Sequence, residues 1–257
     1  ALALLALTQA DPQLSLRVGE AQGALSALVQ AVAVGGAAAI NSAGALGHIA
    51  EANPGLARRV AEVPGALPAL VSAVAAGGGS GTNSASAVGN LAEAGPRLAQ
   101  RVADAPGALS ALVAAVAAGG DTGVNSASAL GDIAWADPGL AQRVGEAPGA
   151  LLALVAAVAA GGDTAEHSAL VLHLIAKADP GLARQVAEAP GALPALVGGV
   201  AAAGSVEAGH CAMALASIAS DGPQPALRVA EAQGALSALV QAVAAGGDGN
   251  TQRGGAF

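Results

Sequence analysis

A single phrase, Gly-Ala-Leu, recurs along this chain of 257 residues at a nearly constant step. Five copies begin 42 residues apart and a sixth follows after 43, at Gly23, Gly65, Gly107, Gly149, Gly191 and Gly234. A period of about 20 to 50 residues is typical of stacked repeats, because one unit cannot bury its apolar face alone. The repeat therefore predicts an array of similar units that share one continuous core.

Each unit is predicted to contain three helices, as the third copy illustrates. Pro96 suits the start of a short helix over residues 97–105, since its missing N–H is not needed there. Pro106 and Gly107 then break the chain. The next helix carries an apolar stripe at i, i+3, i+4 and i+7, formed by Leu109, Leu112, Val113 and Val116. A third helix over residues 125–134 would bury Leu130, Ile133 and Ala134.

Turn and cap residues recur with the same period. Every unit has the opening proline, at Pro12, Pro54, Pro96, Pro138, Pro180 and Pro223. In four units the residue before it is a good N-cap, at Asp11, Asn53, Asp137 and Asp179. Two glycines end the second helix, and Asp121 and Asp163 are expected to cap the third. No segment shows the two-residue period of a strand, so the chain is predicted to be all-α.

The third-helix motif Ala-Leu-Gly-Asp-Ile-Ala (129–134) and the run from Val144 to Val155 resemble armadillo repeats. The resemblance covers essentially the whole chain and implies a right-handed α-solenoid of about six three-helix repeats. Residues 129–147 are most similar to the sperm-antigen type of the ciliary central apparatus. A single solenoid domain over 1–257 is expected. Because Ala1 aligns with Ala85 and Phe257 with Leu130, both ends would fall inside a third helix, which suggests a piece of a longer array.

Composition excludes several classes of partner. A net charge of −8 disfavours nucleic acid and anionic membranes, which attract Lys- and Arg-rich surfaces. The longest apolar stretches fall short of the roughly 20 residues that span a bilayer. A single cysteine, Cys211, fits a reducing compartment, so a cytoplasmic location is expected. The resemblance to the central-apparatus type implies the axoneme as a location within it. Repeated Arg and acidic pairs at i, i+3, such as Arg101 with Asp104, are expected on a solvated outer face.

The residues that could carry chemistry do not form a recognisable site. The glycine-rich stretch 77–82 lacks the lysine of a phosphate loop and is interpreted as a turn. His167 and His173 lie six residues apart, so they cannot share one helix face. His167 and His210 belong to adjacent units, too far apart for a shared zinc, and Cys211 points elsewhere. No catalytic, metal or cofactor site is therefore predicted, and enzyme activity is not expected.

The armadillo resemblance implies that the third helix lines a concave groove, with a tryptophan and, four residues later, an asparagine. The tryptophan positions here hold Gly44, Ser86, Ser128, Leu170 and Met213, and the asparagine positions hold His48, Asn90, Asp132, Leu174 and Ser217. Only Asn90 matches, which argues against the peptide clamp of the nuclear-import type. The predicted partner-binding residues on this face are Asn83, Ser86, Asn90, Asn125, Ser128, Asp132, Trp135, His167, Leu170, Leu174, His210 and Met213.

Two interpretations of this face stay open. Trp135 with Leu170, Leu174 and Met213 fits an interface hot spot, but Leu170 and Leu174 could equally pack in the core. The asparagine column could cap the third helices instead of binding. The favoured function is a non-enzymatic scaffold that binds an extended or helical protein segment, with no small-molecule substrate. The alternatives are a structural subunit packed end to end in an assembly such as the axoneme, and an enzyme or ligand carrier.

Overall fold

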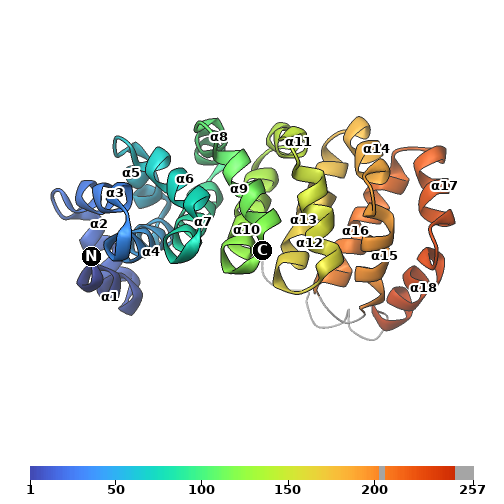
Figure 1. The fold of residues 1–257 in the computed structure, drawn as a ribbon, viewed down its shortest axis with the longest axis horizontal. Coiled ribbons are helices and arrows are strands. Elements are labelled where there is room, and N and C mark those ends of the chain that lie inside the picture. Colours follow the sequence, from blue (N-terminus) through green and yellow to red (C-terminus); the bar gives the residue numbers. More distant parts are fainter. Residues whose placement is uncertain (203–205, 247–257) are drawn as a thin grey trace. The chain divides into compact units, whose positions relative to one another are not determined.

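The computed structural model describes residues 1–202 and 206–246, and the regular elements in this part of the chain are all α-helices (Figure 1). They recur in groups of three, which confirms the predicted solenoid of three-helix repeats. The chain forms two compact units, Ala1–Ala150 and Leu151–Phe257, which are described separately below. The single continuous domain stays a prediction, and the alignment of Phe257 with a third helix lies outside the described residues.

The helices fall into three classes by their position in the repeat. The first helices are α2 (Pro12–Glu20), α5 (Pro54–Glu62), α8 (Pro96–Asp104), α11 (Pro138–Glu146), α14 (Pro180–Glu188) and α17 (Pro223–Glu231). The second helices are α3 (Ala24–Val34), α6 (Ala66–Ala76), α9 (Ala108–Ala118), α12 (Ala150–Ala160), α15 (Ala192–Ala201) and α18 (Ala235–Gly246). The third helices are α1 (Leu2–Ala10), α4 (Gly36–Ala52), α7 (Gly78–Glu93), α10 (Gly120–Ala136), α13 (Asp163–Ala178) and α16 (Val206–Ser220).

The length and composition of these helices show whether any one of them could span a membrane. Across residues 1–202 and 206–246, none of them is by itself both long and apolar enough to cross a bilayer. Three pairs of first and second helices meet the length and composition only when joined, and each pair is bent by 84° to 89°.

The predicted starts of the first helices are confirmed. Each begins with its proline in the first turn. In four of them the preceding side chain accepts a hydrogen bond from a backbone N–H that the helix leaves unpaired. These bonds run from Gln13 N to Asp11 at 2.7 Å, from Gly55 N to Asn53 at 2.6 Å, from Gly139 N to Asp137 at 2.7 Å and from Leu182 N to Asp179 at 3.2 Å.

The third helices begin earlier than the sequence suggested. Helix α10 starts at Gly120 rather than near residue 125, and α7 starts at Gly78, inside the stretch interpreted as a turn. Gly119 has a φ of 74°, a conformation that glycine adopts without strain, and it reverses the chain without a longer linker. The expectation that Asp121 and Asp163 cap these helices is wrong, because both lie in the first helical turn. Their charge there complements the helix dipole.

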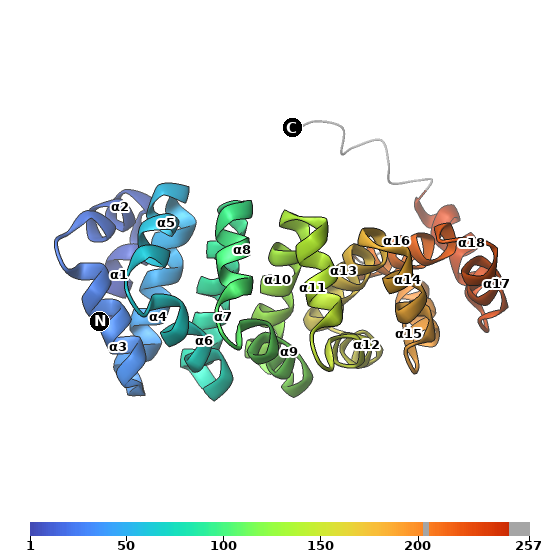
Figure 2. The same cartoon turned by 90° about the horizontal axis from the view of Figure 1, so that it is seen from above.

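The core of the first unit runs along its third helices. Leu130 and Ile133 are fully buried and Ala134 nearly so, as predicted. Helix α7 packs between α4 and α10, and the three lie side by side in Figures 1 and 2. Glycines lie at these contacts, where an added Cβ would meet the backbone of the next third helix at ordinary van der Waals distance. A Cβ on Gly47 would lie 3.6 Å from Ala87 Cα, and one on Gly89 would lie 3.5 Å from Ala129 Cα.

Two arginines of the first helices in the first unit, Arg101 and Arg143, reach the preceding repeat. Arg143 donates to Asp104 Oδ1 at 2.8 Å and to the carbonyl of Ala103 at 2.9 Å. Arg101 donates to the carbonyl of Ala61 at 2.9 Å. Hydrogen bonds from Gln100 and then from Arg143 lower the pKa of Asp104 below its usual value. For Arg101 and Arg143, the contacts of the guanidinium groups join successive repeats instead of forming the predicted i, i+3 pairs.

Candidate partner-binding site

The third-helix face of the first unit carries an acidic row that ends at an exposed indole. Glu51 on α4, Glu93 on α7 and Trp135 on α10 occupy the same position of successive repeats, and all three are exposed. Trp135 is 71% exposed, which is unusual for so large an apolar group. Asp132 lies one helical turn before Trp135. We call these four residues, Glu51, Glu93, Asp132 and Trp135, the acidic face.

Asp132 is held partly out of water. Burial, followed by repulsion from Glu93, raises the pKa of its carboxyl to about 7. Its Oδ2 lies over Gly89, 3.0 Å from where a Cβ on that glycine would stand. The carboxyl group is therefore partly protonated near neutral pH, and a cation placed beside it would favour the charged form.

Replacing Asp132 with asparagine is expected to stabilise the protein in a pH-dependent way. The folded state binds more protons here than the unfolded state between the ordinary pKa of 3.8 and about 7, so wild-type stability falls as pH rises through this window. The uncharged asparagine escapes this penalty. We expect Asp132→Asn to raise the free energy of unfolding by about 1–2 kcal/mol at pH 8 and by little at pH 5. Urea unfolding at both pH values tests this, and an equal gain at both would contradict it.

The asparagines of this face bridge neighbouring third helices. Asn83 donates from Nδ2 to the carbonyl of Ile40 at 2.8 Å, and Asn125 donates to that of Thr82 at 3.0 Å. Asn90 donates to the carbonyl of Gly47 at 3.1 Å. In the second unit His210 Nδ1 lies 3.3 Å from the carbonyl of Glu166, at the position equivalent to Asn83. Each bond reaches the preceding repeat, so the alternative that this column caps its own helices is wrong.

Removing one of these bridges is expected to affect stability more than binding. Asn125→Ala deletes a partly buried hydrogen bond between α7 and α10 and should cost about 1 kcal/mol of unfolding free energy. The amide faces the preceding helix, so affinity for a partner on the acidic face should stay within a factor of two. Thermal unfolding and peptide titration of the same variant separate the two effects. A large loss of affinity at unchanged stability would contradict the bridging role.

The remaining predicted residues differ in exposure. In the first unit Ser86 is exposed, whereas Ser128 is half-buried. In the second unit Met213 is exposed, His167, Leu170 and His210 are half-buried, and Leu174 is only 8% exposed. Because Leu174 is a core side chain, we leave it out of the candidate face. Trp135 belongs to the first compact unit and Leu170 to the second, so their joint hot spot stays a prediction.

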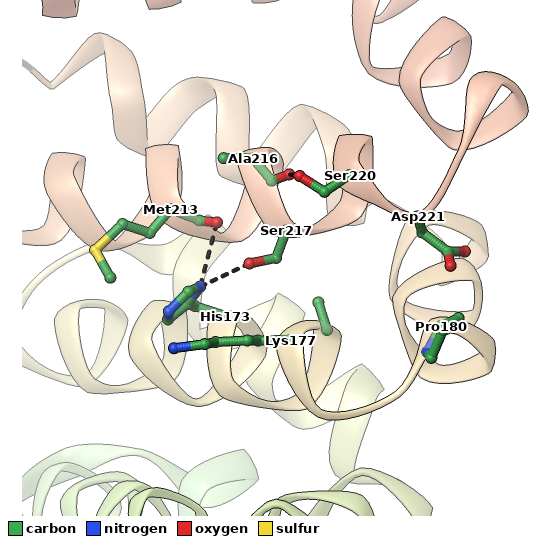
Figure 3. Close-up of a pocket in the computed structure, with 9 residues that line it drawn as sticks. His173, Lys177, Pro180, Met213, Ala216, Ser217, Ser220 and Asp221 are labelled. Atoms are coloured by element: carbon green, nitrogen blue, oxygen red, sulfur yellow. Dashed lines mark hydrogen bonds between the residues drawn. The ribbon is translucent and has the colours of Figure 1, made fainter.

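A groove in the second unit was not foreseen from the sequence. It lies where α13 and α16 meet the start of α14, and the residues that line it include His173, Lys177, Pro180, Met213, Ser217 and Asp221 (Figure 3). His173 is buried, and its Nδ1 lies 2.9 Å from Ser217 Oγ and 3.2 Å from the carbonyl of Met213. The repeat alignment contained the signal, because His173 interrupts a column of glycines at Gly47, Gly89 and Gly131.

The groups considered for metal or nucleophilic chemistry are engaged in structural contacts. His48 lies 3.5 Å from Glu51, and His173 and His210 contact the neighbouring third helix. Cys211 is buried, and burial followed by repulsion from Glu207 raises the pKa of its thiol to about 12. Within the described part of the chain, no three His, Cys, Asp or Glu side chains are grouped to hold a metal.

Taken together, the helix order, the stacked third helices and the proline and glycine turns define an armadillo-type repeat fold. No family model and no curated protein sequence matches the chain. Among solved structures it is similar to a computationally designed armadillo repeat protein for modular peptide recognition. The two share 27% identity and a TM-score of 0.74 over 84% of this chain and 90% of the other. An engineered protein is similar at 28% identity and a TM-score of 0.77, over 84% and 89%.

A third similar structure is a designed armadillo repeat protein in complex with the peptide (KR)4. It shares 26% identity and a TM-score of 0.74, over 84% of this chain and 90% of that one. These similarities support the armadillo-type repeat and carry no information on the sperm-antigen type.

Proposed function

We propose that the protein is a non-enzymatic scaffold that binds an extended segment of another protein along the acidic face. The observation that carries this proposal is the exposed indole of Trp135 beside the carboxyl group of Asp132. An aromatic side chain that makes little contact with the core, on a face that is otherwise polar, is the profile of an interface anchor.

The charges of this face favour a segment with basic side chains. Glu51 and Glu93 present carboxylates at successive repeats, and a Lys or Arg near Asp132 would draw its carboxyl group into the charged form. Arginine also stacks on an indole ring, which adds a cation–π attraction at Trp135. The similar designed protein in complex with (KR)4 supports the same partner class, since that peptide consists of lysine and arginine.

The intrinsic fluorescence of Trp135 tests this proposal directly, because the chain has one tryptophan and no tyrosine. Titration with acetyl-(Lys-Arg)4-amide should change its emission in a saturable way, and the affinity should fall as salt screens the charges. The uncharged peptide acetyl-(Gln-Ser)4-amide is the matched control. An unchanged spectrum, or equal responses to both peptides, would overturn the proposal.

The proposal includes a reducing compartment. Cys211 is the chain's single cysteine and is buried, so the repeats are held together without a disulfide between them. The cytoplasm and the ciliary axoneme both provide such an environment. Localisation of the tagged full-length protein in ciliated cells tests this part separately.

A structural subunit packed end to end is the second candidate, favoured by the surface of α18. Val240 and Val243 are 69% and 76% exposed, whereas the equivalent Val197 and Val200 of α15 are buried. Within the described residues no helix covers these two valines, so a further repeat unit, of a longer chain or of another subunit, could pack there. Light scattering at increasing concentration should show association that Val243→Asp abolishes. A monomer at all concentrations would exclude this candidate for the chain studied.

A further inference from the structure

The groove in the second unit lies at one departure from the repeat. In α4 and α7 this position is a glycine that contacts the next third helix, where an added Cβ would stand 3.6 Å from Ala87 Cα and 3.5 Å from Ala129 Cα, respectively. In α13 the position is His173, whose imidazole fills the space toward α16 and bonds to it. Beside the ring a groove of about 420 Å³ opens, lined by side chains of α13 and α16 (Figure 3).

The hydrogen bonds of His173 define where its proton lies. The carbonyl of Met213 can only accept, so a hydrogen bond to it from Nδ1, 3.2 Å away, requires the tautomer that carries the proton on Nδ1, and we assign this tautomer. Burial, only partly offset by this bond, lowers the pKa of His173, and the charges of Lys177 and His210 act in the same direction as burial. The ring is therefore neutral at pH 7. Ser217 Oγ accepts from the same Nδ1–H, which leaves its own hydroxyl proton for a ligand.

The charges of the groove are separated along its length. Lys177, the only lysine of the chain, extends beside His173, whereas Asp221 lies next to Pro180 (Figure 3). Ser220 donates its hydroxyl to the carbonyl of Ala216 at 2.8 Å, so it has no proton for a ligand. The available donors are thus the Lys177 ammonium and the Ser217 hydroxyl, both near His173, and the aliphatic parts of Met213 and Pro180 form apolar walls.

We propose that this groove binds the carboxylate of an acidic side chain in a partner segment, with Lys177 as its counter-ion and Ser217 as a hydrogen-bond donor. The proposal rests on the proposed function, since it names a chemistry for a second stretch of the third-helix face. Lys177 and Ser217 both line the groove, and an apolar wall beside them suits a glutamate, whose methylene groups would contact the wall while its carboxylate meets Lys177. The acidic face of the first unit favours the opposite charge.

The chain offers a selective reporter for this groove, because Met213 is its only methionine. Protein labelled with ¹³C at the methionine methyl group gives a single resonance from the groove wall. Acetyl-(Glu-Ala)4-amide should shift this resonance in a saturable way, and acetyl-(Gln-Ala)4-amide should not. Lys177→Gln should weaken the glutamate peptide about tenfold, the scale of a lost charge-assisted hydrogen bond. Lys177→Arg, which keeps the charge, should retain most of the affinity.

Three controls make the outcome decisive. Arg184→Gln removes an exposed cation of α14 that does not line the groove and should leave the titration unchanged. Circular dichroism verifies that each variant is folded. Equal shifts from the glutamate and glutamine peptides, or full affinity in Lys177→Gln, would overturn the proposal. If free glutarate at the same carboxylate concentration shifted the resonance as strongly as the peptide, the groove would be a small-acid site and the proposed partner would be wrong.

The failure of one proposal can be distinguished from the failure of the other. Trp135 reports on the acidic face of the first unit, and Met213 reports on the groove of the second. If the Met213 resonance does not shift while the Trp135 emission responds to its peptide, the carboxylate site is wrong and the proposed scaffold function stands. If the Met213 resonance shifts while the Trp135 emission does not change, the proposal that the acidic face binds a basic segment is wrong.

Discussion

Truncation of the exposed indole, Trp135→Ala, is expected to weaken binding of acetyl-(Lys-Arg)4-amide by about 30-fold, or about 2 kcal/mol. The loss combines the stacking surface and the cation–π attraction, while the neighbouring carboxylates remain. The variant should fold normally, since Trp135 is 71% exposed and makes little contact with the core. Because the fluorophore is lost, anisotropy of a fluorescein-labelled peptide is the measurement.

A matched control separates this anchor from general apolar surface. Leu152 is also exposed, on α12, a second helix outside the third-helix face. Leu152→Ala should leave peptide affinity unchanged. Equal affinities for wild type and Trp135→Ala would show that the indole is not the anchor, even if the peptide still binds through the carboxylates.

Leu130→Ala is expected to have the largest effect on stability, lowering the free energy of unfolding by about 3 kcal/mol. Leu130 is fully buried on α10, between the third helices and the shorter helices of its repeat. Small side chains fill most of this core, so few large neighbours can collapse into the cavity. Urea unfolding followed by circular dichroism at 222 nm measures the loss.

The control for this variant is an exposed leucine in the same kind of structure. Leu227 of α17 is 50% exposed, and Leu227→Ala should change the unfolding free energy by less than about 0.5 kcal/mol. A similar cost for both substitutions would mean that burial of Leu130 does not account for its contribution to stability.

Local features of the fold could be predicted because neighbouring residues determine them. The proline starts, the N-caps Asp11 and Asn53, and the buried face of Leu130 and Ile133 depend on interactions within one turn or along one helix. The third-helix starts were wrong for a physical reason. Asp and Thr after a Gly-Gly pair suit a loop equally well, and only the reversal at Gly119 shows that the helix begins at once.

The candidate sites were predicted only in part. Trp135 stood out because it breaks a polar column, and its exposure is as expected for an interface residue. Asn83 and Asn125 belong to the same face, yet their amides bond to the preceding helix, which no spacing along one helix could indicate. The groove was missed because His173 was weighed as a metal ligand rather than as an interruption of the glycine column.

The 42-residue period by itself determined the class of architecture, since each unit's helices are encoded within the unit and its apolar faces need a neighbour. Only the tertiary structure decided what the third-helix positions do. Asp132 is partly buried over Gly89, Asn90 bridges to Gly47, and His173 lines a groove beside Lys177. These roles depend on contacts between residues about 40 positions apart in the sequence. Such contacts are determined by how successive repeats pack together, which the pattern along one helix does not reveal.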